Sequence, residues 1–313
     1  MPLPDALFVS PDHYLQSFDG PDAVFVPMDR AAYHRSIFLD RRISPAPGMA
    51  GKLPIAALSG AAGPALPTAW IFHIAYCGST LLARALDDPA ASLVLREPQT
   101  LRQTAIAGDL GRLPLVLAML GKRYRADAPT LVKANVPVNF LLPRLAAADA
   151  RAPAILLHLP LRAWLLAILR DDNHRTWLRN VTGLLAPYLG DLAHLSDAER
   201  AAALWLAQMD AFAAALAAMP NARALDAEIF FAEPAAMLKA AARHLSVPIE
   251  DAALEATAAG PLFATYSKDP SLAFDNAARV ARNAEIERAI ARDLDTAEAW
   301  IAGRTVPQLT RTL

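Results

Sequence analysis

The sequence of 313 residues contains one cysteine, Cys77, and no apolar run long enough to cross a membrane. A single cysteine excludes an intramolecular disulfide framework and any metal or redox site built on a CxxC pair. The longest apolar stretch, 153–169, is interrupted by His158, Pro160 and Arg162, whereas a spanning helix needs ~18 residues. The first residues also lack the basic start and apolar core of a signal peptide. We therefore expect a soluble, cytoplasmic protein without membrane contacts.

The motifs of several common enzyme classes are missing as well. No Walker GxxxxGK[ST] loop is present, which argues against an ordinary ATPase or GTPase, and no GxGxxG pattern supports dinucleotide redox chemistry. The sequence has no GxSxG nucleophile elbow. Its seven histidines show no HExxH or other ligand spacing, so we predict no metal. A net charge of −1 without any basic block gives no indication of nucleic acid as a partner.

From residue 68 onward, short apolar segments with strand character alternate with helical segments. This alternation predicts a parallel sheet with right-handed crossovers. A helical insertion is expected at about 171–220, where a capping box formed by Ser196 and Glu199 starts a long helix. The predicted strands are 69–76, 92–98, 129–137, 153–160 and a weaker one at 222–228.

Residues 1–67 are interpreted as an N-terminal extension packed on the core domain of residues 68–313. We expect a strand at 22–28 and a helix at 29–40 within it. Residues 44–67 are rich in Ala, Gly and Pro, which is typical of a surface loop or linker.

The stretch Cys-Gly-Ser-Thr lies between a predicted strand and a predicted helix. Unpaired backbone N–H groups at such a junction attract anions, Gly78 permits close approach of a ligand, and Ser79 and Thr80 add hydroxyl donors. One alternative is an ordinary tight turn with Ser79 or Thr80 capping the helix. Another is an activated thiol at Cys77. However, six residues separate Cys77 from Arg84, one more than a tyrosine-phosphatase loop has, and we favour a small residue in a tight loop.

Ligands of parallel α/β sheets bind outside the carboxyl ends of the strands. Lys133 and Glu97 end buried strands there, so we predict functional roles for both. His158 is either a core histidine or a ligand-binding residue, and Arg162 and Arg170 either face solvent or reach the same pocket. The polar segments at the predicted strand ends are Tyr76–Thr80, Arg96–Glu97, Lys133–Asn135, His158–Arg162 and Asp226–Glu228.

These segments resemble the sulfotransferase superfamily over about residues 68–270. The resemblance implies an α/β fold of three layers, with a mostly parallel sheet and a P-loop-like strand–loop–helix. It also implies transfer of a sulfuryl group from 3′-phosphoadenosine 5′-phosphosulfate to a hydroxyl or amine of a small molecule or glycan. The similar stretches are FHIAYCGSTLLARALD (72–87), LREP (95–98), LVKANVPVNFLLP (131–143) and LDAEIFFAEPAAMLKAAARHLSVP (225–248).

The resemblance also suggests roles for individual residues. Lys133 matches a retained family position and is assigned a catalytic role together with Glu97, a carboxylate able to deprotonate the acceptor. The residues expected to bind the donor are Tyr76, Cys77, Gly78, Ser79, Thr80, His158, Arg162 and Lys268.

At four positions the sequence departs from the family pattern. Tyr76 replaces the loop lysine or arginine, and Asn135 replaces the catalytic histidine. His158 and Leu166 replace the arginine and serine that hold the 3′-phosphate. Two alternatives therefore remain open: a P-loop-like enzyme, such as a kinase, that uses another nucleotide, and a catalytically silent binding protein with the same fold. The sequence does not indicate the oligomeric state.

Overall fold

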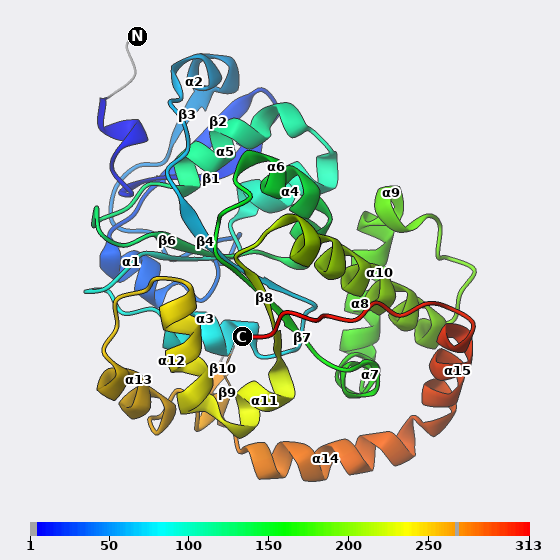
Figure 1. Cartoon of the computed structure of the whole chain (residues 1–313). Coiled ribbons are helices and arrows are strands. Elements are labelled where there is room, and N and C mark those ends of the chain that lie inside the picture. The colour runs from blue at the N-terminus through cyan, green and yellow to red at the C-terminus, as the bar shows by residue number, and fades with distance from the viewer. Residues whose placement is uncertain (1–4, 267–268) are drawn as a thin grey trace.

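The computed structural model describes residues 5–266 and 269–313, which are built around a five-stranded parallel sheet (Figure 1). Its strand order is β5-β6-β4-β7-β8. All six residues of the central strand β4 are buried, as expected of a parallel sheet covered on both faces. The predicted α/β class with a mostly parallel sheet is confirmed. The strands are β4 (Thr68–His73), β5 (Val94–Arg96), β6 (Thr130–Lys133), β7 (Ala154–His158) and β8 (Ala222–Asp226).

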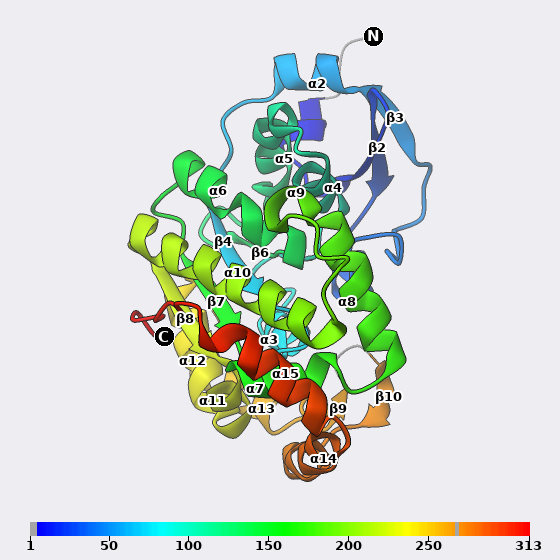
Figure 2. The same cartoon turned by 90° about the vertical axis from the view of Figure 1, so that its right-hand side faces the viewer.

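Helices cover both faces of this sheet. One face is covered by α6 and α10, and the other by α3, α12 and α13, as Figure 2 shows from the side of α10. The predicted capping box at Ser196 and Glu199 begins α10. The helices around the sheet are α3 (Ser79–Ala85), α4 (Gln99–Ala107), η2 (Leu110–Arg112), α5 (Leu113–Leu120), η3 (Val136–Leu141), α6 (Leu142–Ala148), α7 (Leu161–Ile168), α8 (Asp172–Leu184), α9 (Ala186–Leu189), α10 (Asp197–Ala218), α11 (Ala227–Ala232), α12 (Pro234–His244) and α13 (Asp251–Ala258).

Within the described residues one helix, α10, is long and apolar enough to cross a membrane by length and composition. Its contacts are those of a core helix. Trp205 donates a hydrogen bond to the carbonyl of Leu159 (2.9 Å), and Gln208 accepts one from Asn139 (3.0 Å). Phe212 is fully buried. The apolar face of α10 is therefore used to pack against the sheet.

The N-terminal region forms its own antiparallel sheet, β1-β2-β3. Two expectations for this region were wrong. The helix predicted at 29–40 ends at Arg35, and the segment predicted as a loop at 44–67 contains a strand and a helix. Pairing with β2 fixes that strand, and the fully buried Leu58 anchors that helix. The elements are η1 (Asp5–Phe8), β1 (His13–Asp19), β2 (Asp22–Pro27), α1 (Arg30–Arg35), β3 (Gly51–Pro54) and α2 (Ile55–Ala61).

The early end of α1 is explained by Arg96, whose guanidinium is buried (1% exposed) at the end of β5. It donates hydrogen bonds to the carbonyls of Tyr33 (2.7 Å) and Ser36 (2.5 Å) and pairs with the buried carboxylate of Asp87. Because these carbonyls point to Arg96, they cannot continue the helix. The same contacts fix the segment after α1 to the main sheet.

A C-terminal segment closes the structure below the carboxyl ends of the strands (Figure 1). Arg162 on α7 holds it through Glu287 (2.5 Å) and Glu298. The last residues run beside β8, where the amide of Leu313 donates to the carbonyl of Ala224 (2.9 Å). The elements of this segment are β9 (Thr265–Tyr266), β10 (Asp269–Ala273), α14 (Asn276–Ala289) and α15 (Ala291–Ala302).

Candidate functional site

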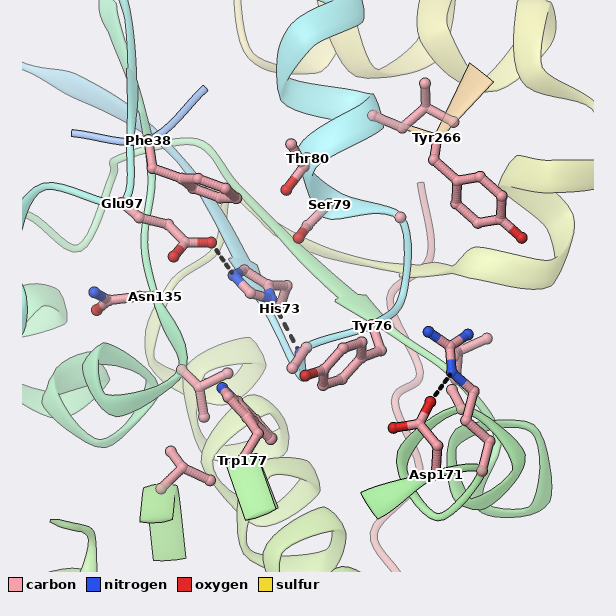
Figure 3. A pocket seen from close by; sticks show the side chains of 18 of the residues that line it. Phe38, His73, Tyr76, Ser79, Thr80, Glu97, Asn135, Asp171, Trp177 and Tyr266 are labelled. Atoms are coloured by element: carbon pink, nitrogen blue, oxygen red, sulfur yellow. Dashed lines mark hydrogen bonds and ion pairs between the residues drawn. The ribbon is translucent and has the colours of Figure 1, made fainter. Parts of the chain in front are cut away.

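A cavity of about 1540 Å³ opens at the carboxyl edge of the parallel sheet (Figure 3). Sites for single small molecules usually measure about 300–1,000 Å³, so this cavity has room for two ligands side by side. It is lined by the β4–α3 loop, the ends of β5 and β6, α4, α7, α8, α11, the β9–β10 hairpin, α14 and the N-terminal segment at 38–42.

The β4–α3 loop has an unusual backbone. Ala75 and Tyr76 adopt positive φ angles of 71° and 53°, and Gly78 follows with a φ of 79°. Left-handed residues of this kind cost about 1–3 kcal/mol each and collect at ligand-binding sites. Successive turns of the backbone can also direct N–H groups at an anion. The ring of Phe231 covers Gly78, where a Cβ would lie 2.7 Å from its Cζ.

Ser79 and Thr80 are buried (4% and 2% exposed) and line the cavity. The N-cap of α3 is Gly78, without a side-chain capping bond, so the alternative of a helix capped by Ser79 or Thr80 does not hold. The hydroxyl of Thr80 has no hydrogen-bond partner within the described residues. Buried polar groups are nearly always paired, and this hydroxyl is therefore available to a ligand. Figure 3 shows both hydroxyls on the side of the loop that faces His73.

Cys77 does not line the cavity. Its side chain is fully buried, and its Sγ lies 3.7 Å from the carbonyl oxygen of Leu157 on β7. A thiol in this position packs the loop against the sheet, and the geometry does not present it as a nucleophile.

Tyr76 lines the cavity at the position that the resemblance gives to the loop lysine. Its ring centroid lies 4.5 Å from that of His174 and 5.2 Å from that of Trp177. Burial raises the pKa of Tyr76 above its usual value, so the phenol is neutral at physiological pH. No lysine side chain of residues 5–266 and 269–313 lines the cavity. Among the described residues, the positive charge on the cavity wall comes from arginines.

Glu97 and Lys133 form an ion pair at the base of the cavity. Lys133 is fully buried at the end of β6 and pairs with Oε1 of Glu97, which lines the cavity with 17% of its side chain exposed. The amide of Glu97, with a φ of 58°, donates to the carbonyl of Lys133 (2.7 Å). Lys133 therefore does not line the cavity itself and holds Glu97 in place.

His73 is a site residue that the sequence reasoning missed. It is the last residue of β4, 5% exposed, and its Nδ1 accepts a hydrogen bond from the amide of Ala75 (3.0 Å). In the neutral ring the proton is then on Nε2, which lies 3.7 Å from Oε1 of Glu97 (Figure 3). A polar residue ending a buried strand was the available signal, the same one that identified Lys133.

Asn135 lies in the same part of the cavity wall (Figure 3). It is 7% exposed, and its Oδ1 has no hydrogen-bond partner within the described residues. Together with the hydroxyl of Thr80, it gives the cavity two buried polar atoms that a ligand could satisfy.

Besides Cys77, two further residues predicted to bind the donor, His158 and Arg162, do not line the cavity. His158 is half-buried beside Asp226 of β8, and burial lowers its pKa. Arg162 points to the carboxylates of α14 and α15, as described above. Lys268 lies outside the described residues. Leu166 lines the cavity as an apolar residue, so neither His158 nor Leu166 supplies the charge of the family's 3′-phosphate site.

Arginines give the cavity an excess of positive charge. Arg279 donates two hydrogen bonds to Glu228 (2.9 and 2.7 Å) and stacks on Phe231 at 4.6 Å, and Arg282 donates to the hydroxyl of Tyr266 (2.7 Å). This balance favours an anionic ligand. Among the described residues, the lining arginines are Arg41, Arg42, Arg102, Arg170, Arg279 and Arg282, and the lining carboxylates are Asp40, Glu97 and Asp171.

An apolar wall lies next to Tyr76. It is formed by Leu166 of α7 and by Trp177, Val181 and Leu184 of α8. Leu184 is 39% exposed, which is unusual for a large apolar side chain. The cavity thus combines charged walls lined by arginines with an apolar wall suited to an apolar group.

No protein-family model and no curated protein matches the chain. Two solved structures are similar to it in fold. One is described as a sulfotransferase domain from the curacin biosynthetic pathway, with 16% identity, a TM-score of 0.40, and coverage of 79% of this chain and 94% of that one. The other is a sulfotransferase from Alicyclobacillus acidocaldarius, with 16% identity, a TM-score of 0.37, and coverage of 76% and 96%. Both likenesses concern the backbone arrangement alone.

Proposed function

We propose that the chain is a sulfotransferase-like enzyme that transfers a sulfuryl group from 3′-phosphoadenosine 5′-phosphosulfate to a hydroxyl or amine of a small molecule or glycan. The observation that carries this proposal is the buried Thr80 hydroxyl, which has no hydrogen-bond partner among the described residues and lies on the wall of a positively charged cavity. It adjoins a loop of left-handed residues and faces the His73–Glu97 pair. An anion on the loop and an acceptor beside Glu97 would therefore be neighbours.

The donor would place its phosphosulfate against the loop at 75–80. Its second phosphate would lie near Arg279 and Arg282, which occupy the C-terminal part of the wall where the resemblance suggested Lys268. Arg170 lies beside Tyr76. Burial raises the pKa of Tyr76, and the positive charge of Arg170 offsets part of this effect. This guanidinium and the loop amides would stabilise the charge that develops on the leaving phosphate.

Glu97 is the proposed general base. As the acceptor oxygen forms a bond to sulfur, the bond from sulfur to the 5′-phosphate oxygen breaks, and the acceptor proton passes to Glu97. The Nδ1 of His73 already accepts from Ala75, so the carboxylate is better placed than the imidazole for this role. Lys133, which does not line the cavity, would position Glu97, and His73, which does line it, lies against the same carboxylate.

The altered positions Tyr76, His158 and Leu166 favour a second candidate, a transferase that uses a nucleotide without a 3′-phosphate. Thermal unfolding separates the two. Addition of 3′-phosphoadenosine 5′-phosphate at ~100 times its Kd should add about 2.7 kcal/mol of stability. Stabilisation by ATP with magnesium, and not by the bisphosphate, would replace the first proposal with the second.

The effect of the bisphosphate should depend on Thr80. Thr80→Val removes the hydroxyl while keeping the shape of the side chain, and it should weaken the stabilisation. Thr257→Val, on the exposed face of α13, is the matched control and should leave it unchanged. A wild-type protein that responds to no nucleotide would contradict the proposed function and favour a silent binding protein.

A further inference from the structure

We infer that the acceptor carries an anionic group, a carboxylate or a phosphate, which Arg41 and Arg102 bind next to Glu97. The inference rests on the proposed function, because it names the class of acceptor for the same site. One of the two arginines, Arg41, belongs to the N-terminal segment, which lies outside the stretch that resembles sulfotransferases.

Two backbone hydrogen bonds hold this segment against the site. The amide of Leu39 donates to the carbonyl of Arg96 (2.7 Å), and the carbonyl of Leu39 accepts from the amide of Gln99 (3.3 Å). Residues 38–42 therefore run beside the turn that carries Glu97. Phe38, Asp40, Arg41 and Arg42 all line the cavity as a result.

Arg102 reaches the same region from α4. It follows Gln99 by three residues, and residues at this spacing share one face of a helix. Both side chains line the cavity, and Gln99 is buried (9% exposed). Because α4 begins two residues after Glu97, its first turn places Arg102 on the same side of the cavity as that carboxylate.

As far as residues 5–266 and 269–313 show, Arg41 and Arg102 differ from the other lining arginines in having no protein partner. Within the described residues neither side chain makes a hydrogen bond or an ion pair. Arg42, in contrast, makes two hydrogen bonds to Asp40 (2.9 and 2.5 Å) and lies 3.8 Å from the ring centroid of Phe38.

Arg41 and Arg102 are not needed to neutralise Glu97, because Lys133 already does so. The carboxylate is already paired with the buried Lys133, so its charge is compensated from below. Arg41 and Arg102 thus add positive charge above a site that is already neutral. A guanidinium matches a carboxylate or phosphate group with two parallel hydrogen bonds. An acid-bearing acceptor would be attracted to this charge, because Glu97 is paired with Lys133 and Asp40 with Arg42.

The apolar wall at Trp177 and Leu184 suggests aromatic probes. We would measure the binding of 4-hydroxyphenylacetate and of its uncharged amide by calorimetry, with and without 3′-phosphoadenosine 5′-phosphate. Phenyl phosphate and benzyl alcohol form a second pair that tests a phosphate in place of a carboxylate. Both comparisons work in the free protein, so they remain informative if the bisphosphate does not bind.

The wild-type protein should bind at least one of the two acids about tenfold more tightly than its neutral counterpart, since hydrogen bonds between charged groups have this strength. The double variant Arg41→Ala/Arg102→Ala should lose this preference. Arg151→Ala, which removes an exposed arginine outside the cavity, should retain it. The acid that shows the preference identifies the anionic group.

Two results would overturn the inference. One is equal affinity for the acid and the neutral compound in both pairs, and the other is a preference for the acid that survives in the double variant. If that surviving preference is lost in Arg279→Ala, the anion binds instead to the arginines near the β9–β10 hairpin. The bisphosphate could fail to bind while the wild type still prefers the acid and the double variant does not. This result would contradict the proposed donor and leave the inference about the acceptor standing.

Discussion

Oε1 of Glu97, which follows β5, lies 3.7 Å from Nε2 of His73 at the end of β4, across the end of the intervening strand β6. The same oxygen accepts a hydrogen bond from the buried Lys133. Three neighbouring strand ends therefore converge on one carboxylate. Glu97 and His73 line the cavity, whereas the buried Lys133 acts on it through Glu97.

Glu97→Gln should reduce sulfuryl transfer by about 100-fold or more, because a positioned general base contributes about 10²–10⁴-fold to rate. The amide keeps the size of the side chain but cannot accept the proton of the acceptor. Transfer is measured with labelled donor, and bisphosphate binding by thermal shift should stay unchanged. Turnover equal to that of the wild type would remove Glu97 from the mechanism.

The ion pair itself is tested by removing its buried cation. Lys133→Met leaves the carboxylate of Glu97 in a largely buried position without its partner, which should lower the free energy of unfolding by about 3 kcal/mol. The double variant Lys133→Met/Glu97→Gln should recover part of this loss, since no buried charge remains. Urea unfolding measures both. Additive losses would show that the two side chains do not act as a pair.

The strand ends could be predicted from the sequence because the pattern is local. A short apolar run that stops at a polar residue identifies Lys133, Glu97 and the loop at 76–80, and parallel strands bring such residues to one edge. The same rule applies to His73, which was overlooked inside a run that looked wholly apolar. Its polarity at the end of β4 was visible, but its partner on β5 was not.

Other site residues depend on contacts between distant parts of the chain. Arg41 reaches the cavity because Arg96 and Leu39 fasten the N-terminal segment to β5, and no local pattern encodes those contacts. The sequence also could not separate Arg162, which lies on α7, from Arg170, which lies between α7 and α8. One pairs with Glu287 on α14 and the other lines the cavity, a difference that depends on how the C-terminal helices pack.

Gly78 should tolerate no side chain. Gly78→Ala requires a φ of 79° and brings a Cβ within 2.7 Å of Phe231, so we expect a loss of about 2 kcal/mol in the free energy of unfolding. The double variant Gly78→Ala/Phe231→Leu should recover the stability lost through the clash with Phe231, but not the stability lost through the positive φ. Gly60→Ala is the control, because a Cβ there meets nothing within 4 Å. Equal effects of the two glycine substitutions would refute the role given to Gly78.

Lys122 should make stability depend on pH. Burial lowers the pKa of Lys122 to about 7, while its amine donates to the carbonyls of Leu7 (3.1 Å) and His13. The unfolded chain binds the extra proton between about pH 7 and the usual lysine pKa of about 10.4. The contribution of Lys122 to stability therefore rises with pH across this window, by up to about 1.4 kcal/mol per unit.

This pH effect is measured as a difference between variants. The wild type should gain stability relative to Lys122→Met as the pH is raised from 7 to 9. Lys52→Met, at an exposed lysine paired with Asp19, should show no such change relative to the wild type. A constant difference between the wild type and Lys122→Met over this range would show that Lys122 titrates alike in both states.

Tyr76 decides whether the loop has lost a catalytic cation. Tyr76→Lys places an ammonium next to the loop amides, where charge would build on the leaving phosphate, and should raise the rate of sulfuryl transfer above that of the wild type. The substitution also removes the ring from its contacts with His174 and Trp177. Tyr76→Phe therefore serves as the matched control, since it keeps the ring and adds no charge, and should transfer at the wild-type rate.

A lysine variant that binds 3′-phosphoadenosine 5′-phosphate normally but transfers no faster would mean that Arg170 already supplies this charge or that the donor is a different nucleotide. Adding Arg170→Ala to Tyr76→Lys distinguishes these outcomes, because an active sulfuryl-transfer site must then depend on the new lysine.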